Sequence, residues 1–165
     1  MKTFKHTSLW AMALLFCTLL FSGCASFKIT TPDEMAEVGP QDKAYDYRAL
    51  TVRGVVLGVR VISQGKYDDV PRANEVFWVD ATRQRMRTLG GYALLSEEPV
   101  QSANGHSGTR LKFGRDQRGT TYWYWVTLFV TEDNIHVIDA GGRREHFEES
   151  QSVIEQALAS YVVRD

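Results

Sequence analysis

One cysteine of the chain stands where its thiol could be chemically modified. Cys24 follows the apolar run from Leu9 to Phe21 and the two small residues Ser22 and Gly23. Small residues allow a peptidase to draw extended backbone into its cleft, and a thiol is nucleophilic enough to accept a diacylglycerol group. The spacing therefore predicts cleavage just before Cys24 and attachment of lipid to its sulfur.

The region upstream of Cys24 has the three parts of a bacterial export signal: positive charge at Lys2 and Lys5, the apolar run, and the small residues. Together with the cysteine it resembles the lipobox of bacterial lipoproteins, although Phe21 stands where that motif usually has leucine. The resemblance implies two or three fatty acyl chains, palmitate among them, on Cys24. Because Ala25 rather than aspartate follows the cysteine, it also implies the outer membrane, with the protein facing the periplasm.

Two other interpretations of residues 1–23 remain open, an uncleaved membrane anchor and an ordinary secretory signal. A bilayer span needs roughly 20 apolar residues, and the run from Leu9 to Phe21 is shorter than that. Cys17 lies inside the removed segment, so Cys24 would be the only cysteine left and no internal disulfide is expected. The fold must then rest on core packing, which a chain of this length can supply.

Composition and charge argue against nucleic acid as a partner. The chain carries 19 Lys+Arg against 20 Asp+Glu, a formal net charge of −1, with no block of like charges, whereas nucleic-acid binders concentrate positive charge. We expect three regions: a signal peptide at 1–23, the lipidated cysteine and a tether at 24–44, and one globular domain at 45–165. Within the tether, residues 27–30 could be an edge strand, and Thr31 could cap a short helix.

Most of the globular domain is predicted to be strands joined by short turns. Aromatic and β-branched residues predict a strand pair across residues 45–62, broken at Arg53-Gly54. Asn104-Gly105 predicts a hairpin, with a loop that could extend to Gly108. Further strands are expected at 92–103, 109–115, 120–131 and 135–140.

Two helices are expected among these strands. Apolar residues at helical spacing predict the first helix, with Asp69 as its cap and Gly90-Gly91 at its end. The second carries an apolar stripe of Phe147, Ser150, Ile154, Ala157, Leu158 and Tyr161. A capping box of Ser152 and Glu155 would start this helix near residue 151.

The order of these elements predicts an α+β fold class, with an antiparallel meandering sheet of about six to seven strands and two main helices packed on it. Over residues 45–163 the order resembles the PsbP-like α/β sandwich family, through "YDYRA", "GYALL", "GTRLKF" and "GGRREHF". Members of that family mostly act as noncatalytic assembly or accessory factors. The resemblance therefore implies a noncatalytic role.

No set of residues predicts catalysis, a metal site or a cofactor. Ser107 lies in "GHSGT", which lacks the last glycine of the hydrolase motif Gly-x-Ser-x-Gly and has strands on both sides. His136 and Asp139 are three apart on a predicted strand, so they point to opposite faces. His146 and Glu149 could share a helix face, but zinc needs at least three protein ligands. We expect a protein that is not an enzyme and binds no cofactor.

An aromatic strand supplies the candidate ligand face. Within residues 120–131, alternation sends Trp123, Trp125 and Phe129 to one face and Tyr124 to the other, and both faces are apolar. Trp123, Trp125 and Phe129 could line a groove that stacks on a sugar or holds an acyl chain. The alternative is a central strand covered on both faces.

Arginine and lysine residues form two sequence clusters that could recognise an anionic partner, such as a phosphate-bearing lipid or glycan. Solubilising surface charge is the alternative. The clusters are Arg83 with Arg87, and Arg110 with Lys112, Arg115 and Arg118.

Two hypotheses about function follow. The first is a noncatalytic, lipid-anchored envelope lipoprotein that acts as an accessory or assembly module beside an envelope protein partner. The second is a carrier or sensor that holds a lipid or glycan on the face formed by Trp123, Trp125 and Phe129.

Overall fold

The computed structural model describes residues 25–39, 44–65 and 72–165, so the signal segment and Cys24 lie outside the described residues. In chain order the elements are β1 (Phe27–Lys28), β2 (Met35–Glu37), β3 (Tyr47–Thr51), β4 (Val56–Ser63), α1 (Glu75–Thr88), β5 (Ala93–Gln101), β6 (Ser107–Gln117), β7 (Thr120–Val130), β8 (Asn134–Arg143), α2 (Arg144–Ala159) and β9 (Val162–Val163). Among the described residues, neither helix has the length and apolar character needed to cross a bilayer.

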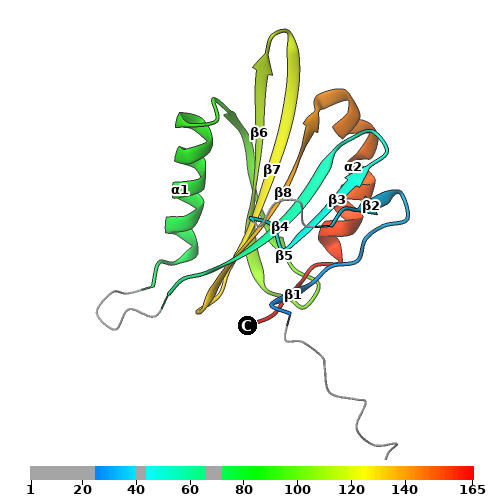
Figure 1. Cartoon of the computed structure of the whole chain (residues 1–165). Helices are drawn as coiled ribbons and strands as arrows, with labels where there is room; N and C mark the ends of the chain where they lie inside the picture. Colours follow the sequence, from blue (N-terminus) through cyan, green and yellow to red (C-terminus); the bar gives the residue numbers. More distant parts are fainter. Residues whose placement is uncertain (1–24, 40–43, 66–71) are drawn as a thin grey trace, which may run out of the picture.

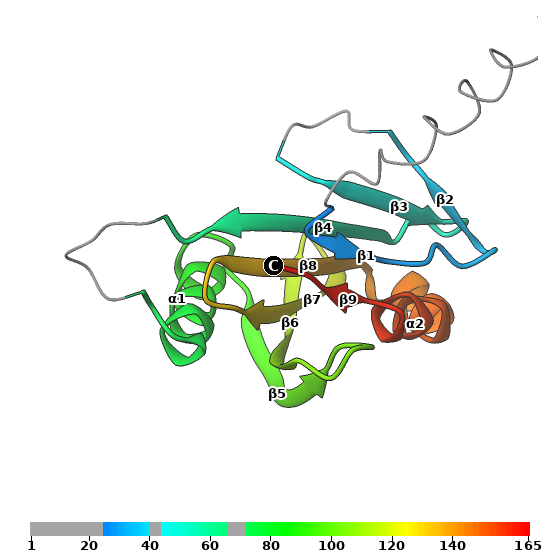
Figure 2. The same cartoon turned by 90° about the horizontal axis from the view of Figure 1, so that it is seen from below.

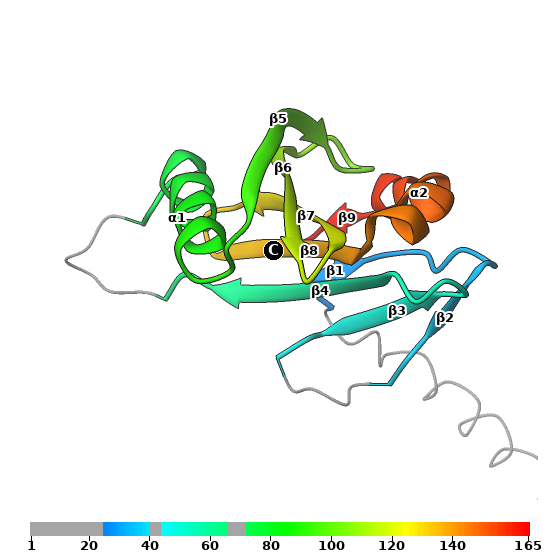
Figure 3. The ribbon, with the colours of Figure 1, turned by 90° about the horizontal axis from the view of Figure 1, so that it is seen from above.

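Seven of the described strands form one antiparallel sheet in the order β2-β3-β4-β8-β7-β6-β5. The short strands β1 and β9 pair with each other beside it (Figure 1). Helices α1 and α2 lie on opposite sides of the large sheet (Figures 2 and 3). The α+β class predicted from the sequence is confirmed, with two helices and an antiparallel sheet of seven strands in the described chain.

The apolar residues separate into two cores, one under each helix. Phe147 and Ile154 of α2 are fully buried against the sheet. Leu57 of β4 is fully buried in the same core. On the other face Val79 of α1 packs with Leu111 of β6 in a smaller core. The six residues of the predicted stripe are all buried, but only five of them lie on α2, because the helix ends at Ala159 and Tyr161 follows it.

Strand β7 lies near the middle of the sheet and contributes to both cores. Trp125 and Phe129 are 4% and 3% exposed and belong to the core under α2. Val126 and Leu128, on the alternate positions, belong to the core under α1. The predicted alternation is therefore correct, and the strand contributes buried residues to the core on each face.

Two hairpins fix the register of the β5-β6-β7 arm. β6 and β7 are joined by Arg118 and Gly119 with φ of 52° and 79°, and two positive φ values in a two-residue loop are typical of a type I′ turn. The hairpin predicted at Asn104-Gly105 has a longer loop, as the sequence allowed. Asn104 bonds both the N–H and the C=O of Val163, which ties this loop to β9.

The short helix predicted after Thr31 is wrong, because this segment forms a turn and strand β2. The N–H of Met35 donates to the oxygen of Pro32 at 3.0 Å, and the Thr31 hydroxyl contacts the Tyr47 hydroxyl at 2.7 Å rather than capping a helix. Pairing with β3 places Met35 opposite Thr51 and buries its side chain. A separate two-turn helix would be less stable than this strand pairing, because helix nucleation costs free energy.

The observed first residues of α1 and α2 differ from those that the sequence predicted. The side chain of Asn74 caps α1 by accepting from the N–H of Phe77 at 3.1 Å, and the predicted cap Asp69 lies outside the described residues. Helix α2 begins at Arg144 directly after β8, not near residue 151. An earlier start places Phe147 within the helix, where it packs against Trp125.

Candidate binding groove beside helix α1

Helix α1 is attached to its face of the sheet by few buried residues. Val79 is its one buried residue, whereas Val76, Phe77 and the C-cap residue Leu89 are between 55% and 77% exposed. One helix of this length cannot cover the full width of the sheet, and a hollow lies on each flank. The helix therefore leaves apolar surface of the sheet open beside it.

The larger hollow, which we call the α1 groove, lies between α1 and strands β4, β7 and β8, with a volume of about 680 Å³. Its apolar walls come from Trp78, Met86 and Leu89 of the helix and from Val126, Leu128 and Val137 of the sheet. The indole N–H of Trp78 donates to Gln64 at 3.3 Å, which orients this wall. Known ligand sites are of this size and are mostly apolar, with a few polar groups that fix orientation.

A buried carboxylate stands beside the α1 groove. Asp139 of β8 is 4% exposed and accepts hydrogen bonds from Arg60 Nη2 at 3.0 Å and from the Tyr45 hydroxyl at 3.3 Å. The hydroxyl of Tyr124 also bonds this carboxylate. Arg60 and Tyr124 line the groove themselves, so the cluster forms its polar end.

Two glycines make room for the tyrosine rings of this cluster. A Cβ on Gly58 would lie 2.5 Å from the ring of Tyr45, and a Cβ on Gly141 would lie 2.5 Å from the ring of Tyr124. Because such contacts are too short, any side chain at either position would displace the ring above it. The glycines of β4 and β8 thus allow both hydroxyl groups to reach Asp139.

Two arginines, Arg60 and Arg85, line the groove, and Asp139 neutralises only Arg60. Burial raises the pKa of Asp139, while Arg60 and the tyrosine hydrogen bonds act in the opposite direction. The Arg60 guanidinium lies over the Tyr45 ring at 5.1 Å, and its Nε is buried without a partner among the described residues. Arg85, also on the groove, forms no ion pair or side-chain hydrogen bond with the described chain. Among the described residues, one positive charge at the groove therefore has no opposite charge beside it.

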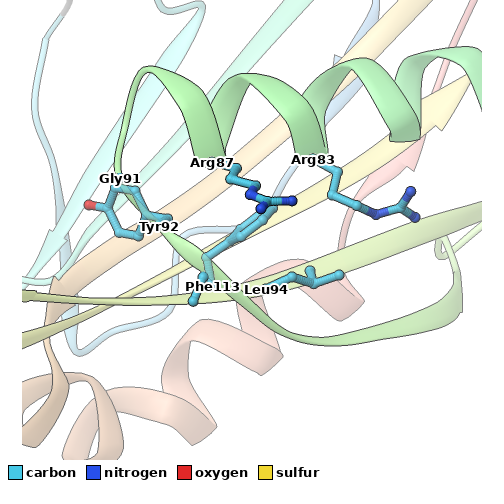
Figure 4. Close-up of a pocket in the computed structure, with 7 residues that line it drawn as sticks. Arg83, Arg87, Gly91, Tyr92, Leu94 and Phe113 are labelled. Atoms are coloured by element: carbon cyan, nitrogen blue, oxygen red, sulfur yellow. The ribbon is translucent and has the colours of Figure 1, made fainter.

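A second hollow of about 470 Å³, the β5 hollow, lies on the other flank of α1. Figure 4 shows the side chain of Arg87 extending from the helix toward Phe113, while Arg83, one turn earlier, points away from that ring. Arg83 is already bound to Asp80 and Glu97, which raises its pKa chiefly through the Glu97 hydrogen bond. The predicted pair Arg83 and Arg87 is therefore brought to one hollow, but half of its charge is neutralised.

The predicted ligand face is covered by helix α2. Trp125 packs against Phe147 with ring centroids 4.8 Å apart, and Trp123, half-buried, packs against the same ring at 6.1 Å. Phe129 stacks on Tyr161 at 5.7 Å. Trp125 and Phe129 take part in the core, which is the alternative that the sequence left open, although Phe129 also lines a hollow of about 300 Å³ between α2 and strands β5, β6 and β7.

The second predicted charge cluster is divided between several acceptors. Arg110 and Lys112 lie over the Trp125 ring and pair with Glu98. Arg115 donates to the oxygen of Gly90 and lies over the ring of Tyr92. Arg118 occupies the β6-β7 turn.

The structure separates the other residues considered for chemistry. Ser107 is exposed at the start of β6. His136 and Asp139 point to opposite faces, as predicted, with His136 under α2. His146 contacts Glu145, and Glu149 pairs with Arg53 at 2.7 Å. Within the described residues, no three His, Cys, Asp or Glu side chains come close enough to hold a metal.

Neither Arg60 nor the role of Asp139 beside it is predicted by the sequence. The available signal was a charged residue in each of two apolar strands, "VVLGVRVI" and "IHVIDA". Their pairing depends on β4 lying next to β8, with Gly58 opposite Asp139. Nothing in either segment specifies that neighbour.

His136 is expected to make the fold less stable below neutral pH. Its ring is fully buried, with Nδ1 2.8 Å from the Tyr161 hydroxyl, and burial lowers its pKa from 6.5; Asp165 acts against this shift and His106 adds to it. The unfolded chain therefore binds the proton more readily. Stability is present above pH 6.5 and is lost as pH falls toward the folded-state pKa, by at most about 1.4 kcal/mol at pH 5.5.

Urea unfolding at about pH 7.5 and pH 5.5 measures this loss, and His136→Gln should show a smaller decrease than the wild type. His146→Gln, on the surface of α2, is the matched control and should retain the wild-type decrease. Equal decreases in the wild type and in His136→Gln would contradict the assignment.

The chain has an α+β fold with one helix on each face of an antiparallel sheet, and its structural neighbours include a PsbP protein. No family model matches the chain, and no curated protein matches it. The likeness therefore comes from solved structures alone.

Three solved structures show this likeness. LpqN, described as involved in cell envelope biogenesis of Mycobacterium tuberculosis, has a TM-score of 0.68 at 9% identity, covering 84% of this chain and 83% of that one. Cyanobacterial PsbP (CyanoP) from Synechocystis sp. PCC 6803 has a TM-score of 0.53 at 10% identity, covering 90% and 98%. PA94 of Pseudomonas aeruginosa, a protein of unknown function, has 0.52 at 12%, covering 87% and 88%. Identities this low show the shared fold alone.

Proposed function

We propose that the chain is a noncatalytic lipoprotein, anchored to the outer membrane through Cys24, whose domain serves as an accessory module of an envelope assembly. The observation that carries the proposal is the position of Cys24, behind an export signal and directly before the fold. The likeness to LpqN, a protein involved in cell envelope biogenesis, and to PsbP supports the same role.

The folded domain begins almost at the proposed lipid. The N–H of Arg164 donates to the oxygen of Ser26 at 3.0 Å, and Phe27 stacks on Tyr161 with centroids 5.6 Å apart. Two residues of extended chain reach about 7 Å. A lipid on Cys24 would therefore hold the β1-β9 end of the domain close to the bilayer surface, where two or more acyl chains make a durable anchor.

Substituting Cys24 by serine is expected to release the protein from membranes. The full-length wild type should sediment with the membrane fraction and incorporate labelled palmitate, and Cys24→Ser should lose the label, because serine carries no thiol to accept lipid. Cys17→Ser, inside the signal, is the matched control and should keep both properties. A variant Cys24→Ser that still sediments, together with a wild type that takes up no palmitate, would refute the anchor.

The accessory role has its own test. Mild crosslinking of intact membranes, followed by recovery of the wild type, should yield an envelope protein that is absent when Cys24→Ser is recovered in the same way. Recovery of the chain alone would count against an assembly role, even if the lipid anchor is correct.

A second candidate function, a carrier or sensor of amphipathic molecules, is favoured by the α1 groove. The groove has the volume of a ligand site, and Leu128 and Val137 form part of its floor. Trp78 forms one wall, so binding should change tryptophan emission, whereas Trp78→Phe should remove most of that change. Emission that is unchanged with envelope lipids and glycans would exclude this function.

A further inference from the structure

We infer that the α1 groove binds a long-chain fatty acid, with its carboxylate on Arg60 and Arg85 and its hydrocarbon chain along the apolar walls. The inference rests on the second candidate function and names its ligand class. It does not depend on the lipid anchor at Cys24.

The groove is amphipathic in the manner that such a ligand requires. The sheet supplies Val126, Leu128 and Val137, and the helix supplies Trp78 and Met86, so a chain between them loses contact with water on both sides. Each buried methylene favours binding by about 0.8 kcal/mol. The apolar walls thus favour a ligand with a hydrocarbon chain, and the charged groups determine which head group the ligand carries.

The charge of the groove fits one negative charge. Arg60 and Arg85 line it, and Asp139 neutralises one of them through its 3.0 Å bond to Arg60 Nη2. A carboxylate would neutralise the other. A phosphate monoester, with a charge of about −1.5 to −2 at pH 7, would leave an excess of negative charge beside Asp139. The ligand head is therefore assigned as a carboxylate.

The cation at the head is already held in place. The Arg60 guanidinium lies 5.1 Å from the Tyr45 ring and is bonded to a buried carboxylate, so little freedom remains to be lost on binding. The Arg60 side chain is nevertheless 36% exposed and lines the groove, so the guanidinium can be reached there. A carboxylate oxygen is a strong acceptor for such a donor.

The helix can adjust to admit the chain. Of the residues of α1, only Val79 is buried, and Leu89 at its end is 77% exposed. Elements with few buried contacts open at low free energy. Entry between α1 and β4 therefore does not require unfolding of the larger core under α2.

The test uses residues 25–165, which contain every described strand and helix, and displacement of fluorescent cis-parinaric acid below the micellar range. Palmitate should displace the probe at least tenfold more effectively than hexadecanol, which has the same chain and no charge. A charge-assisted hydrogen bond accounts for about this factor. Equal displacement by both ligands would overturn the carboxylate assignment.

Two matched pairs of variants locate the site. Arg85→Gln should weaken palmitate binding about tenfold, whereas Arg87→Gln, on the same helix at the β5 hollow, should not change it. Ala81→Trp should fill the groove and prevent displacement by either ligand, whereas Ala93→Trp, in the β5 hollow, should not.

Failure of palmitate binding and failure of the lipid anchor would give different results. Equal effects of Arg85→Gln and Arg87→Gln, or binding that survives Ala81→Trp, would overturn the α1 groove as the site. Neither result changes the fractionation expected for Cys24→Ser. Conversely, a soluble wild type would refute the anchor and leave the palmitate measurements intact.

Discussion

Phe147→Ala is expected to lower the free energy of unfolding by about 3–5 kcal/mol, the range observed when a buried aromatic ring is removed. Phe147 of α2 is fully buried against the aromatic strand, with ring centroids 4.8 Å from Trp125 and 6.1 Å from Trp123. Since domains are stable by about 5–15 kcal/mol, the change would remove a large part of the total.

Urea unfolding followed by circular dichroism measures the loss, and Phe77→Ala is the matched control. Phe77 lies on the other helix and is 55% exposed, so the same substitution should cost about 1 kcal/mol or less. If Phe147→Ala does not fold, Phe147→Leu should fold and cost less than about 2 kcal/mol. Equal losses for the two alanine variants would show that α2 is not the main support of the sheet.

The parts of the fold that the sequence predicted well depend on periodicity within one element. The stripe of α2 recurs at helical spacing, and the alternation of β7 sends Trp125 and Val126 to different cores. Both patterns follow from the geometry of a single element. They do not require knowledge of its neighbours.

The parts that the sequence could not predict depend on neighbours distant in the chain. β2 forms because Met35 pairs with Thr51, and β1 forms because Phe27 pairs with Val163 near the other end of the described chain. The local signals at Thr31 favoured a helix. Tertiary pairing outweighed them, as it usually does in short segments.

The candidate site shows the same limit. The sequence predicted a ligand face at Trp123 and Trp125 because aromatic residues are frequent in ligand sites, but α2 packs on that face. The open groove lies on the opposite face of the same strand, beside Tyr124. Which face stays open depends on how much of it each helix covers, and α1 covers its face less completely than α2 does.

Asp139→Ala is expected to destabilise the domain by about 3 kcal/mol. Removal of one partner from a buried ion pair costs about 3–5 kcal/mol, and the lower end applies because the Arg60 side chain is 36% exposed. The substitution also leaves the Tyr45 and Tyr124 hydroxyl groups without their acceptor. Glu149→Ala, which removes an exposed pair with Arg53, should cost at most about 1 kcal/mol.

Asp139→Ala also separates stability from binding, because the two should change in opposite directions. The variant loses the carboxylate that neutralises Arg60, so the α1 groove gains net positive charge and should bind palmitate at least as tightly as the wild type, measured where the variant is still folded. Asp139→Asn, which keeps an acceptor for the tyrosine hydroxyl groups, should lose less stability. If Asp139→Ala were as stable as Glu149→Ala, the cluster would not support the sheet. If it were folded but bound palmitate more weakly than the wild type, the positioning of Arg60 by Asp139 would outweigh the charge that Asp139 neutralises.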